Sequence, residues 1–186
     1  MLPRQAIAIG SSAGGIDALD FLLPHLRSDT KVSVFIVQHI KANSDSFFVT
    51  MMNRKCQFRV KEPCNTEEIA PGTIYFAPPD YHMLIEENFT LTLSADEKVN
   101  FSRPSIDVMF ETAAEAYGKN LIGIILTGAN KDGSVGLRSI KRRGGITIVQ
   151  NPKNAAFPEM PTAALALHAP DKILSLEDIG AYLMTL

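Results

Sequence analysis

Glycine and serine residues interrupt an apolar run near the start of the chain, with a spacing that suits a nucleophilic serine. The run Ala6-Ile7-Ala8-Ile9 is followed by Gly10-Ser11-Ser12-Ala13-Gly14, after which the apolar residues take the period of a helix. A buried strand that turns sharply into a helix is typical of a nucleophile elbow, Gly-x-Ser-x-Gly, in which small neighbours leave the serine hydroxyl accessible. Only Ser12 is centred between two glycines, so Ser12 is the candidate nucleophile and Ser11 is not.

The same stretch is also compatible with a nucleotide site or with a plain tight turn. A dinucleotide site needs the pattern Gly-x-Gly-x-x-Gly and an acidic residue at the end of the second strand. Here the glycines stand at positions 10, 14 and 15, and the second apolar run ends in Gln38-His39. The sequence therefore disfavours a dinucleotide cofactor.

A histidine and an aspartate follow two other predicted strands. His39 ends the run 31–39, and Asp132 lies in the loop after 121–126, the most apolar run of the chain. A serine needs a base to take its proton, and the base needs a buried acid to orient it. Because parallel strands end at one edge of a sheet, Ser12, His39 and Asp132 can meet there as nucleophile, base and acid. Taken singly, His39 also reads as a polar strand end and Asp132 as the N-cap of the next helix.

Strand and helix patterns alternate along most of the chain and predict the fold class. The predicted strands are 6–10, 31–39, 72–77, 121–126 and 146–150, and the predicted helices are 15–27, 44–54, 104–117, one ending at 143, 158–167 and one capped by Ser175-x-x-Asp178. A hairpin over 83–86 and 89–93 interrupts this order. We expect one α/β domain over 1–186, with a doubly wound, mostly parallel sheet and helices on both faces. The run 121–126 is expected at the sheet centre, and the antiparallel hairpin at one edge.

Composition and charge exclude several classes of function. The 186 residues carry a net charge of -2, which gives no basic footprint for nucleic acid. No apolar run has the length to span a bilayer, and the N-terminus lacks the pattern of a signal peptide. Cys56 and Cys64 are too few for a zinc site and suit free thiols in a reducing cytoplasm. We expect a cytoplasmic protein that uses no metal and no cofactor.

Several longer motifs together resemble the catalytic domain of the CheB chemotaxis methylesterase family. They cover nearly the whole sequence and lie at 9–15, 37–39, 71–83, 103–110 and 126–133. The resemblance implies a serine hydrolase that cleaves γ-glutamyl methyl esters on chemoreceptor helices and releases methanol, with deamidation of receptor glutamines as a second activity. It implies the roles already assigned to Ser12, His39 and Asp132.

The same resemblance extends to residues around the three. Backbone N–H groups near Ala13 and Ala129 are expected to hold the oxyanion. Arg103 and His82 are candidate substrate-binding residues, and an ordinary surface ion pair is the alternative role of Arg103. A catalytically weak docking module of the same fold, which binds a receptor or a signalling partner, stays open as the alternative. Activity on a simple ester would distinguish the two.

The sequence also departs from the family pattern. Gly128-Ala129-Asn130-Lys131-Asp132-Gly133 stands where the family usually has Gly-Met-Gly-x-Asp-Gly. Asn130 in place of glycine is expected to alter the loop backbone, although asparagine tolerates left-handed conformations better than most residues. Ser11-Ser12-Ala13 replaces Ala-Ser-Thr, which removes a hydroxyl beside the nucleophile. The chain opens on the first catalytic strand, so we expect no receiver domain in it.

Overall fold

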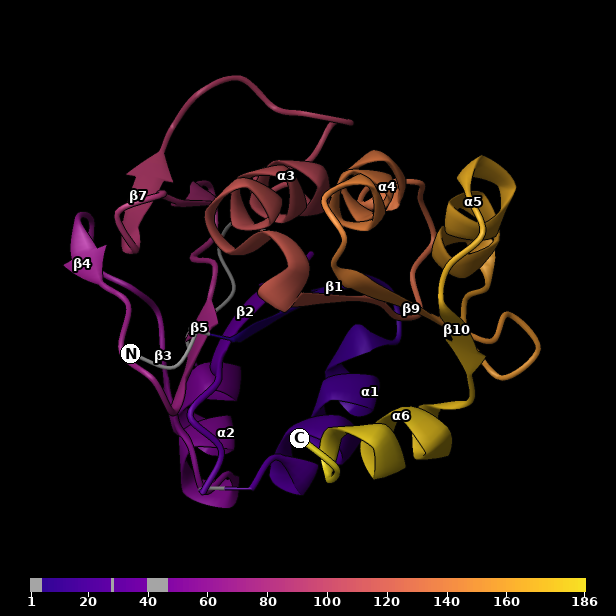
Figure 1. The fold of residues 1–186 in the computed structure, drawn as a ribbon, viewed down its shortest axis with the longest axis horizontal. Helices are drawn as coiled ribbons and strands as arrows, with labels where there is room; N and C mark the ends of the chain where they lie inside the picture. The colour runs from indigo at the N-terminus through magenta and orange to yellow at the C-terminus, as the bar shows by residue number, and fades with distance from the viewer. Residues whose placement is uncertain (1–4, 28, 40–46) are drawn as a thin grey trace.

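A seven-stranded parallel sheet divides the molecule into two helical layers (Figure 1). The computed structural model describes residues 5–27, 29–39 and 47–186. Within them the strand order is β10-β9-β8-β1-β2-β5-β3, and every neighbouring pair runs parallel. The strands are β1 (Ala6–Ser11), β2 (Ser33–Gln38), β3 (Arg59–Lys61), β5 (Thr73–Phe76), β8 (Leu121–Ile125), β9 (Ile146–Gln150) and β10 (Lys172–Leu174). The predicted fold class is confirmed.

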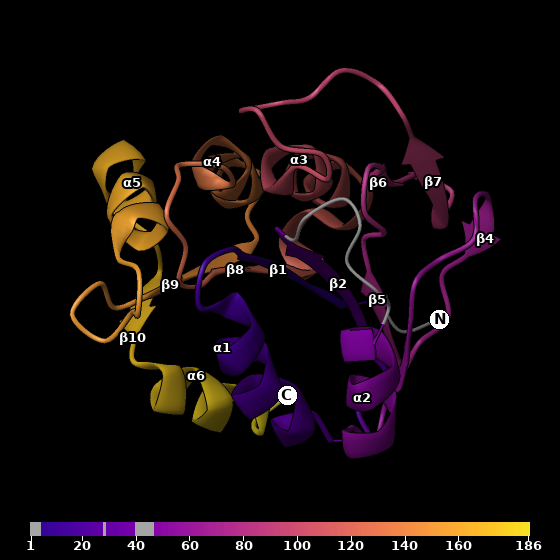
Figure 2. The same cartoon turned by 180° about the vertical axis from the view of Figure 1, so that it is seen from behind.

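Helices cover both faces of this sheet, as the two opposite views show (Figures 1 and 2). On one face lie α3 (Ile106–Tyr117), α4 (Ser134–Arg142) and α5 (Glu159–Leu167). On the other lie α1 (Gly15–Leu22), a 3₁₀ turn (Leu23–His25), α2 (Phe47–Lys55) and α6 (Leu176–Leu183). The predicted helix 15–27 ends early, at Leu22, because Pro24 has no N–H with which to continue an α-helical hydrogen-bond ladder. Residues 44–46 of the predicted helix 44–54 lie outside the described residues.

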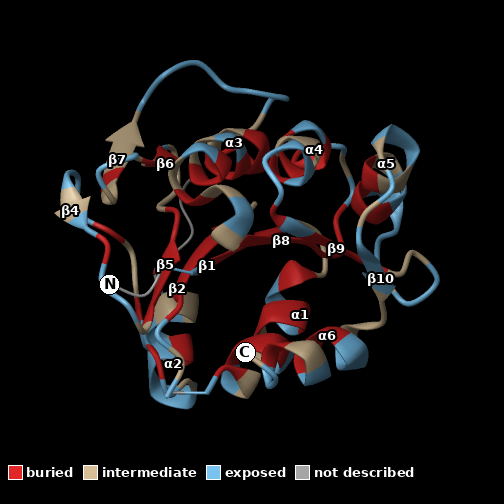
Figure 3. Cartoon of the chain, viewed as in Figure 1, coloured by how far each residue is buried: buried red, intermediate tan, exposed pale blue. Residues whose placement is uncertain are grey.

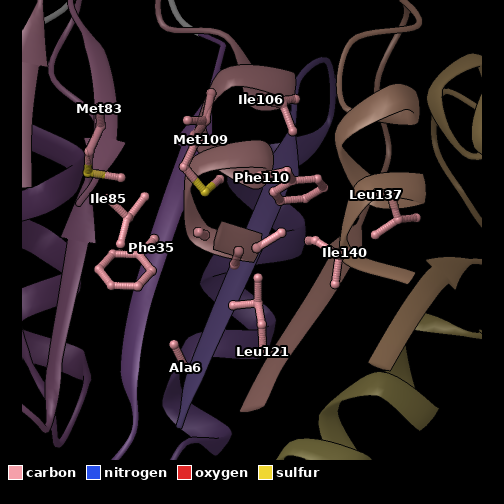
Figure 4. Packing of buried hydrophobic residues seen from close by; sticks show 14 of the residues in the cluster. Ala6, Phe35, Met83, Ile85, Ile106, Met109, Phe110, Leu121, Leu137 and Ile140 are labelled. Carbon is pink, nitrogen blue, oxygen red and sulfur yellow. The ribbon is translucent and has the colours of Figure 1, made fainter. Parts of the chain in front are cut away.

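The sheet is buried on both sides, and its alternating side chains enter two separate cores (Figure 3). In β1, Ala6 and Ala8 face the α3 layer, whereas Ile7 and Ile9 face the α1 layer. Small alanines let α3 approach the sheet closely, and Figure 4 shows Ala6 near the larger side chains that pack between α3 and the sheet. Full burial of each isoleucine contributes about 1.5–3 kcal/mol to stability.

The topology places a switch point between β1 and β8. The chain runs outward from β1 through β2 to β5, then returns to β8 on the opposite side of β1. β1 is therefore the middle strand, and the prediction that 121–126 lies at the centre was wrong by one place. Both strands are buried on both faces, so apolar content alone does not rank them. Ligands of such sheets bind beyond the carboxyl ends of the strands at the switch point.

The predicted hairpin is confirmed as β6 (His82–Ile85) and β7 (Thr90–Ser94), which pair antiparallel. Together with β4 (Glu67–Glu68) it forms a second, three-stranded sheet that is separate from the main one. The segment that joins β7 to α3 passes above α3 in the view of Figure 1. The short strands β3, β4 and β10 escaped prediction, because two or three residues are too few to show an alternating pattern.

Candidate active site

The turn after β1 positions Ser12 and explains both glycines of the motif. A Cβ at Gly10 would lie 2.3 Å from Cγ2 of Ile106, so the close approach of α3 requires glycine there. Gly14 has a φ of 74° and forms the N-cap of α1, a left-handed conformation that glycine adopts without strain. The Ser12 N–H donates to the Thr127 carbonyl across 3.0 Å, which joins the β1 turn to the β8 loop.

Ser11 and Ser12 point in different directions. Ser11 is fully buried, and its hydroxyl donates to Oε1 of Gln38 across 2.7 Å. The amide nitrogen of Gln38 donates in turn to the carbonyls of Ser12 and His39, at 2.8 and 3.0 Å. Gln38 therefore fixes the loops that follow β1 and β2 against each other. In the sequence Gln38 is only a polar residue at a strand end, and no pattern there reveals its hydrogen bonds to two backbone carbonyls.

His39 and Asp132 meet at the carboxyl edge of the sheet. His39 Nε2 lies 3.0 Å from Asp132 Oδ2, and the aspartate side chain is fully buried while the histidine is 13% exposed. The same oxygen of Asp132 accepts the Ile106 N–H across 2.6 Å. The other interpretation of Asp132, as N-cap of the next helix, is wrong, because Gly133 holds that position in α4. Asp132 instead lies at the N-terminus of α3, where the helix dipole favours a negative charge.

Burial and hydrogen bonding act on the charge of Asp132 in opposite directions. Burial alone would raise the pKa of this carboxyl group. Hydrogen bonds from His39, the Ile106 N–H and the Asn100 amide outweigh burial and hold the pKa below its ordinary value. Asp132 is therefore an ionised carboxylate that can orient an imidazole.

Asn130 lies between Ser12 and His39. Its Nδ2 is 3.2 Å from Ser12 Oγ and 3.2 Å from His39 Nδ1, and its Oδ1 accepts the Asp132 N–H across 2.9 Å. A backbone N–H can only donate, so the amide must present its nitrogen to the histidine. His39 Nδ1 is then the unprotonated nitrogen, and Nε2–H donates to Asp132. This tautomer leaves the basic lone pair on the serine side.

The backbone of Asn130 does not adopt the left-handed conformation that would favour glycine at this position. Asn130 is not among the residues with a positive φ, so the left-handed conformation does not explain it. Its effect comes from the side chain, which occupies the space between the two reactive groups. A family pattern shows that a glycine is replaced but not where the new side chain points.

The two candidate oxyanion donors lie on the loops on either side of Ser12. Thr127 Oγ1 donates to the Ala13 carbonyl across 3.0 Å, and the Gly128 N–H donates to the Phe157 carbonyl across 3.0 Å. Neither the Ala13 N–H nor the Ala129 N–H donates to an acceptor within the described part of the chain. Both amides are therefore available to a ligand.

The structure contradicts the assignment of His82 as a substrate-binding residue. His82 is only 2% exposed, and its Nδ1 accepts the Ser105 N–H across 3.1 Å. Its Nε2 therefore carries the proton and donates to the Glu97 carbonyl, also at 3.1 Å. A buried ring with both nitrogens engaged cannot contact a substrate, so His82 supports the segment before α3.

Arg103 lies beside the site but is largely occupied. Its Nη1 donates to the carbonyls of Ala95 and Asp96, at 2.6 and 2.9 Å, and so braces the segment that joins β7 to α3. It also lines a hollow of about 170 Å³ together with His39, Lys98 and Phe101. A substrate-binding role for Arg103 stays a prediction.

A second buried carboxyl group lies behind Asp132. Asn100 Nδ2 donates to Asp107 Oδ2 across 2.8 Å and to Asp132 Oδ1 across 3.1 Å. Burial raises the pKa of Asp107 to about 6, against the lowering effect of a hydrogen bond from the Gly136 N–H and with a further rise from the charge of Asp132. Asp107 and Asp132 thus accept hydrogen bonds from the same Asn100 amide, but the pKa of Asp107 is raised whereas that of Asp132 is lowered.

This difference predicts a pH effect on stability. The folded pKa of Asp107 lies above its ordinary value of 3.8, so the folded protein holds this proton more firmly than the unfolded chain. The stability from this group is present below about pH 4 and is lost as the pH rises through about 6. We expect the unfolding free energy of the wild type, minus that of Asp107→Asn, to fall across this window in urea titrations. A difference that does not change with pH would contradict the raised pKa.

Neither a metal-binding cluster nor a membrane-spanning helix is present in residues 5–27, 29–39 and 47–186. No three histidine, cysteine, aspartate or glutamate side chains gather there as a metal-ion site would require. Within the same residues, no helix has both the length and the apolar character needed to cross a membrane.

The fold and the site together define a class of protein. A parallel α/β sheet carries a serine on a tight strand-to-helix turn, with a histidine–aspartate pair beside it, as in serine hydrolases. The chain belongs to the CheB methylesterase family, whose model, described as CheB methylesterase, matches residues 7–183.

Similar proteins agree with this family. A protein of Leptospira interrogans is 49% identical over 176 residues, which cover 95% of this chain and 91% of its own length. The protein-glutamate methylesterase/protein-glutamine glutaminase of Bordetella pertussis is 38% identical over 98% of this chain, which spans 53% of that relative. The CheB methylesterase catalytic domain of Thermotoga maritima superposes with a TM-score of 0.93 at 29% identity, covering 99% of both chains.

Proposed function

We propose that the protein is a protein-glutamate methylesterase that hydrolyses γ-glutamyl methyl esters on chemoreceptor cytoplasmic helices and releases methanol, with glutamine deamidation as a second activity. The observation that carries this proposal is the His39–Asp132 contact of 3.0 Å, in the tautomer whose unprotonated Nδ1 shares the Asn130 amide with Ser12 Oγ. The names of the Bordetella relatives support both activities. The docking-module alternative is not favoured, because the family model is described as a methylesterase and the Bordetella pertussis relative is named for both enzyme activities.

The proposed reaction begins with attack by Ser12. Its Oγ forms a bond to the ester carbon while its proton passes to His39 Nδ1, and the carbonyl electron pair moves onto oxygen. The N–H groups of Ala13 and Ala129 are the proposed donors to this oxyanion. Asp132 stabilises the imidazolium that forms.

The tetrahedral intermediate then collapses. The carbon–methoxy bond breaks, and Nδ1 returns its proton to the leaving oxygen, so methanol departs and a glutamyl ester of Ser12 forms. Water, deprotonated by the same nitrogen, attacks this ester and releases the receptor carboxylate and Ser12. With a glutamine side chain the same steps release ammonia.

The direct test measures methanol release from a methylated receptor cytoplasmic fragment. We expect one methanol for each site cleaved, and mass spectrometry of the fragment should show a mass decrease of one CH2 for each site, since a methyl group is replaced by hydrogen. Binding of the fragment without methanol release, combined with no cleavage of a simple ester, would favour the docking module instead.

Asn130 predicts a separate effect on the reactivity of Ser12. Its amide must leave His39 Nδ1 before that nitrogen can accept the serine proton, and one neutral hydrogen bond contributes about 1 kcal/mol. We expect Asn130→Ala, which needs no unusual backbone conformation, to speed labelling of Ser12 by a small fluorophosphonate about fivefold. Asn88→Ala, in the hairpin turn, serves as the control. Slower labelling of the Asn130 variant would mean that the amide assists the attack.

A further inference from the structure

A strained two-residue turn lies in the segment that joins β7 to α3. Val99 and Ser102 exchange two backbone hydrogen bonds, with N–H to carbonyl distances of 3.2 and 2.9 Å, and enclose Asn100 and Phe101. Both enclosed residues are left-handed, with φ of 51° and 62°. These are the signs of φ that a type I′ turn requires.

The left-handed backbone of this turn disfavours phenylalanine, which has a Cβ atom and a bulky side chain. Type I′ turns strongly prefer Asn-Gly or Asp-Gly, because glycine alone adopts the left-handed conformation freely. Asn100 fits its position, but Phe101 stands where glycine is favoured. Phe101 is also 98% exposed, so burial of its ring does not offset the strain. A strained residue that gains nothing from the fold points to a role outside it.

The structure holds this turn firmly. Asn100 Nδ2 donates to Asp107 and to Asp132, which are both buried, and these bonds fix the turn to the start of α3. Arg103 binds the carbonyls of Ala95 and Asp96 on the other side of the turn. The exposed ring therefore stands on a rigid support that also contacts the acid of the candidate triad.

The turn also lies beside the reactive groups. Phe101 and Lys98 line the same hollow of about 170 Å³ as His39. The segment passes above α3 (Figure 1), and α3 begins where Ile106 binds Asp132. A protein segment that enters the site from this side meets an aromatic ring and an exposed lysine first.

We propose that Phe101 is a docking anchor for the α-helical segment of the substrate protein that carries the methyl ester. This proposal rests on the proposed function. The ring packs on apolar side-chain stems of the helix next to the target side chain, and Lys98 pairs with the glutamyl carboxylates that ester hydrolysis leaves on that helix. A rigid aromatic residue suits this purpose because few of its rotamers are lost on binding.

The test measures the activity of the full chain on two substrates, a methylated receptor cytoplasmic fragment and p-nitrophenyl acetate. We expect Phe101→Ala to lower the ratio of receptor to acetate kcat/KM by about tenfold or more, mainly through KM for the receptor. Phe47→Ala is the matched control, since Phe47 is 72% exposed and begins α2 on the other face of the sheet. It should leave the ratio unchanged. If Phe101→Ala lowers both activities equally, or neither, the docking role is wrong.

A second variant separates docking from folding. Phe101→Gly creates the Asn-Gly pair that the turn prefers, so we expect the midpoint of thermal unfolding to rise by about 2–4 °C while the receptor ratio falls. A lower midpoint would show that Phe101 supports the fold and would overturn the proposal. Wild-type protein that cleaves neither substrate would instead refute the proposed function. If Phe101→Ala weakens self-association in sedimentation and leaves the receptor-to-acetate ratio unchanged, the docking proposal is wrong and the ring contacts a second copy of the chain.

Discussion

Replacing Ser12 with alanine is expected to abolish ester hydrolysis, with turnover falling by about a millionfold if the three residues act as a unit. The variant loses the hydroxyl oxygen that we propose forms the acyl intermediate. Its fold should be preserved, because the Ser12 backbone keeps its bonds to Thr127 and Gln38. The measurement is single-turnover methanol release from a methylated receptor fragment, with the unfolding midpoint checked in parallel.

Ser11→Ala is the matched control for this experiment. Its hydroxyl is buried and binds Gln38, so removing it leaves the Oε1 of Gln38 without a donor. We expect a loss of about 1–3 kcal/mol in the unfolding free energy and a change in turnover of less than about tenfold. A dead Ser11 variant with an active Ser12 variant would show that the serine register of the elbow is wrong.

The sequence was sufficient for the strands and for the parts of the site that follow strand ends. Apolar runs predicted the five longest strands of the main sheet, because a strand buried on both faces must be apolar throughout. In a parallel sheet the residues after those runs share one edge. The sequence alone therefore predicted that Ser12, His39 and Asp132 lie at the same edge. The His39–Asp132 contact and the nearness of both to Ser12, through Asn130, were thus predictable at the level of the shared edge, although the roles of the three residues stay proposals.

The polar supports of the site could not be predicted in the same way. Gln38, Asn100 and Asn130 each bind groups that are distant in the sequence, and a single amide in a loop carries no periodic signal. For His82 the sequence instead predicted an exposed residue that the structure buries. A histidine in a polar turn looks accessible, but the Ser105 N–H and the Glu97 carbonyl enclose it. Tertiary packing decides which polar residues face the solvent.

Asp132→Asn is expected to lower turnover by about ten-thousandfold, because it changes the tautomer of His39. The Asp132 carboxylate accepts hydrogen bonds from five donors: His39 Nε2, Ile106 N–H, Asn100 Nδ2, Ser105 Oγ and Asp107 N–H. An asparagine whose amide nitrogen takes the place of Oδ2 donates to His39 Nε2 and leaves the ring proton on Nδ1, although it also opposes the Ile106 N–H that Oδ2 accepts. That nitrogen then faces Ser12 with a proton and cannot act as a base.

The amide can also turn the other way, and the experiment distinguishes the two orientations. In this second orientation the amide nitrogen takes the place of Oδ1 and faces Ser105 Oγ and the Asp107 N–H. The variant then keeps an oxygen acceptor for His39, but its nitrogen opposes the Asp107 N–H at the start of α3. Stability would then fall more than turnover. Asp107→Asn is the control, since it alters a neighbouring buried carboxyl group that binds Asn100 but not His39. We expect its loss in single-turnover methanol release to be at least a hundredfold smaller than that of Asp132→Asn. If the two variants lose activity equally while both stay folded, the orienting role of Asp132 is refuted, and His39 is held by the network as a whole.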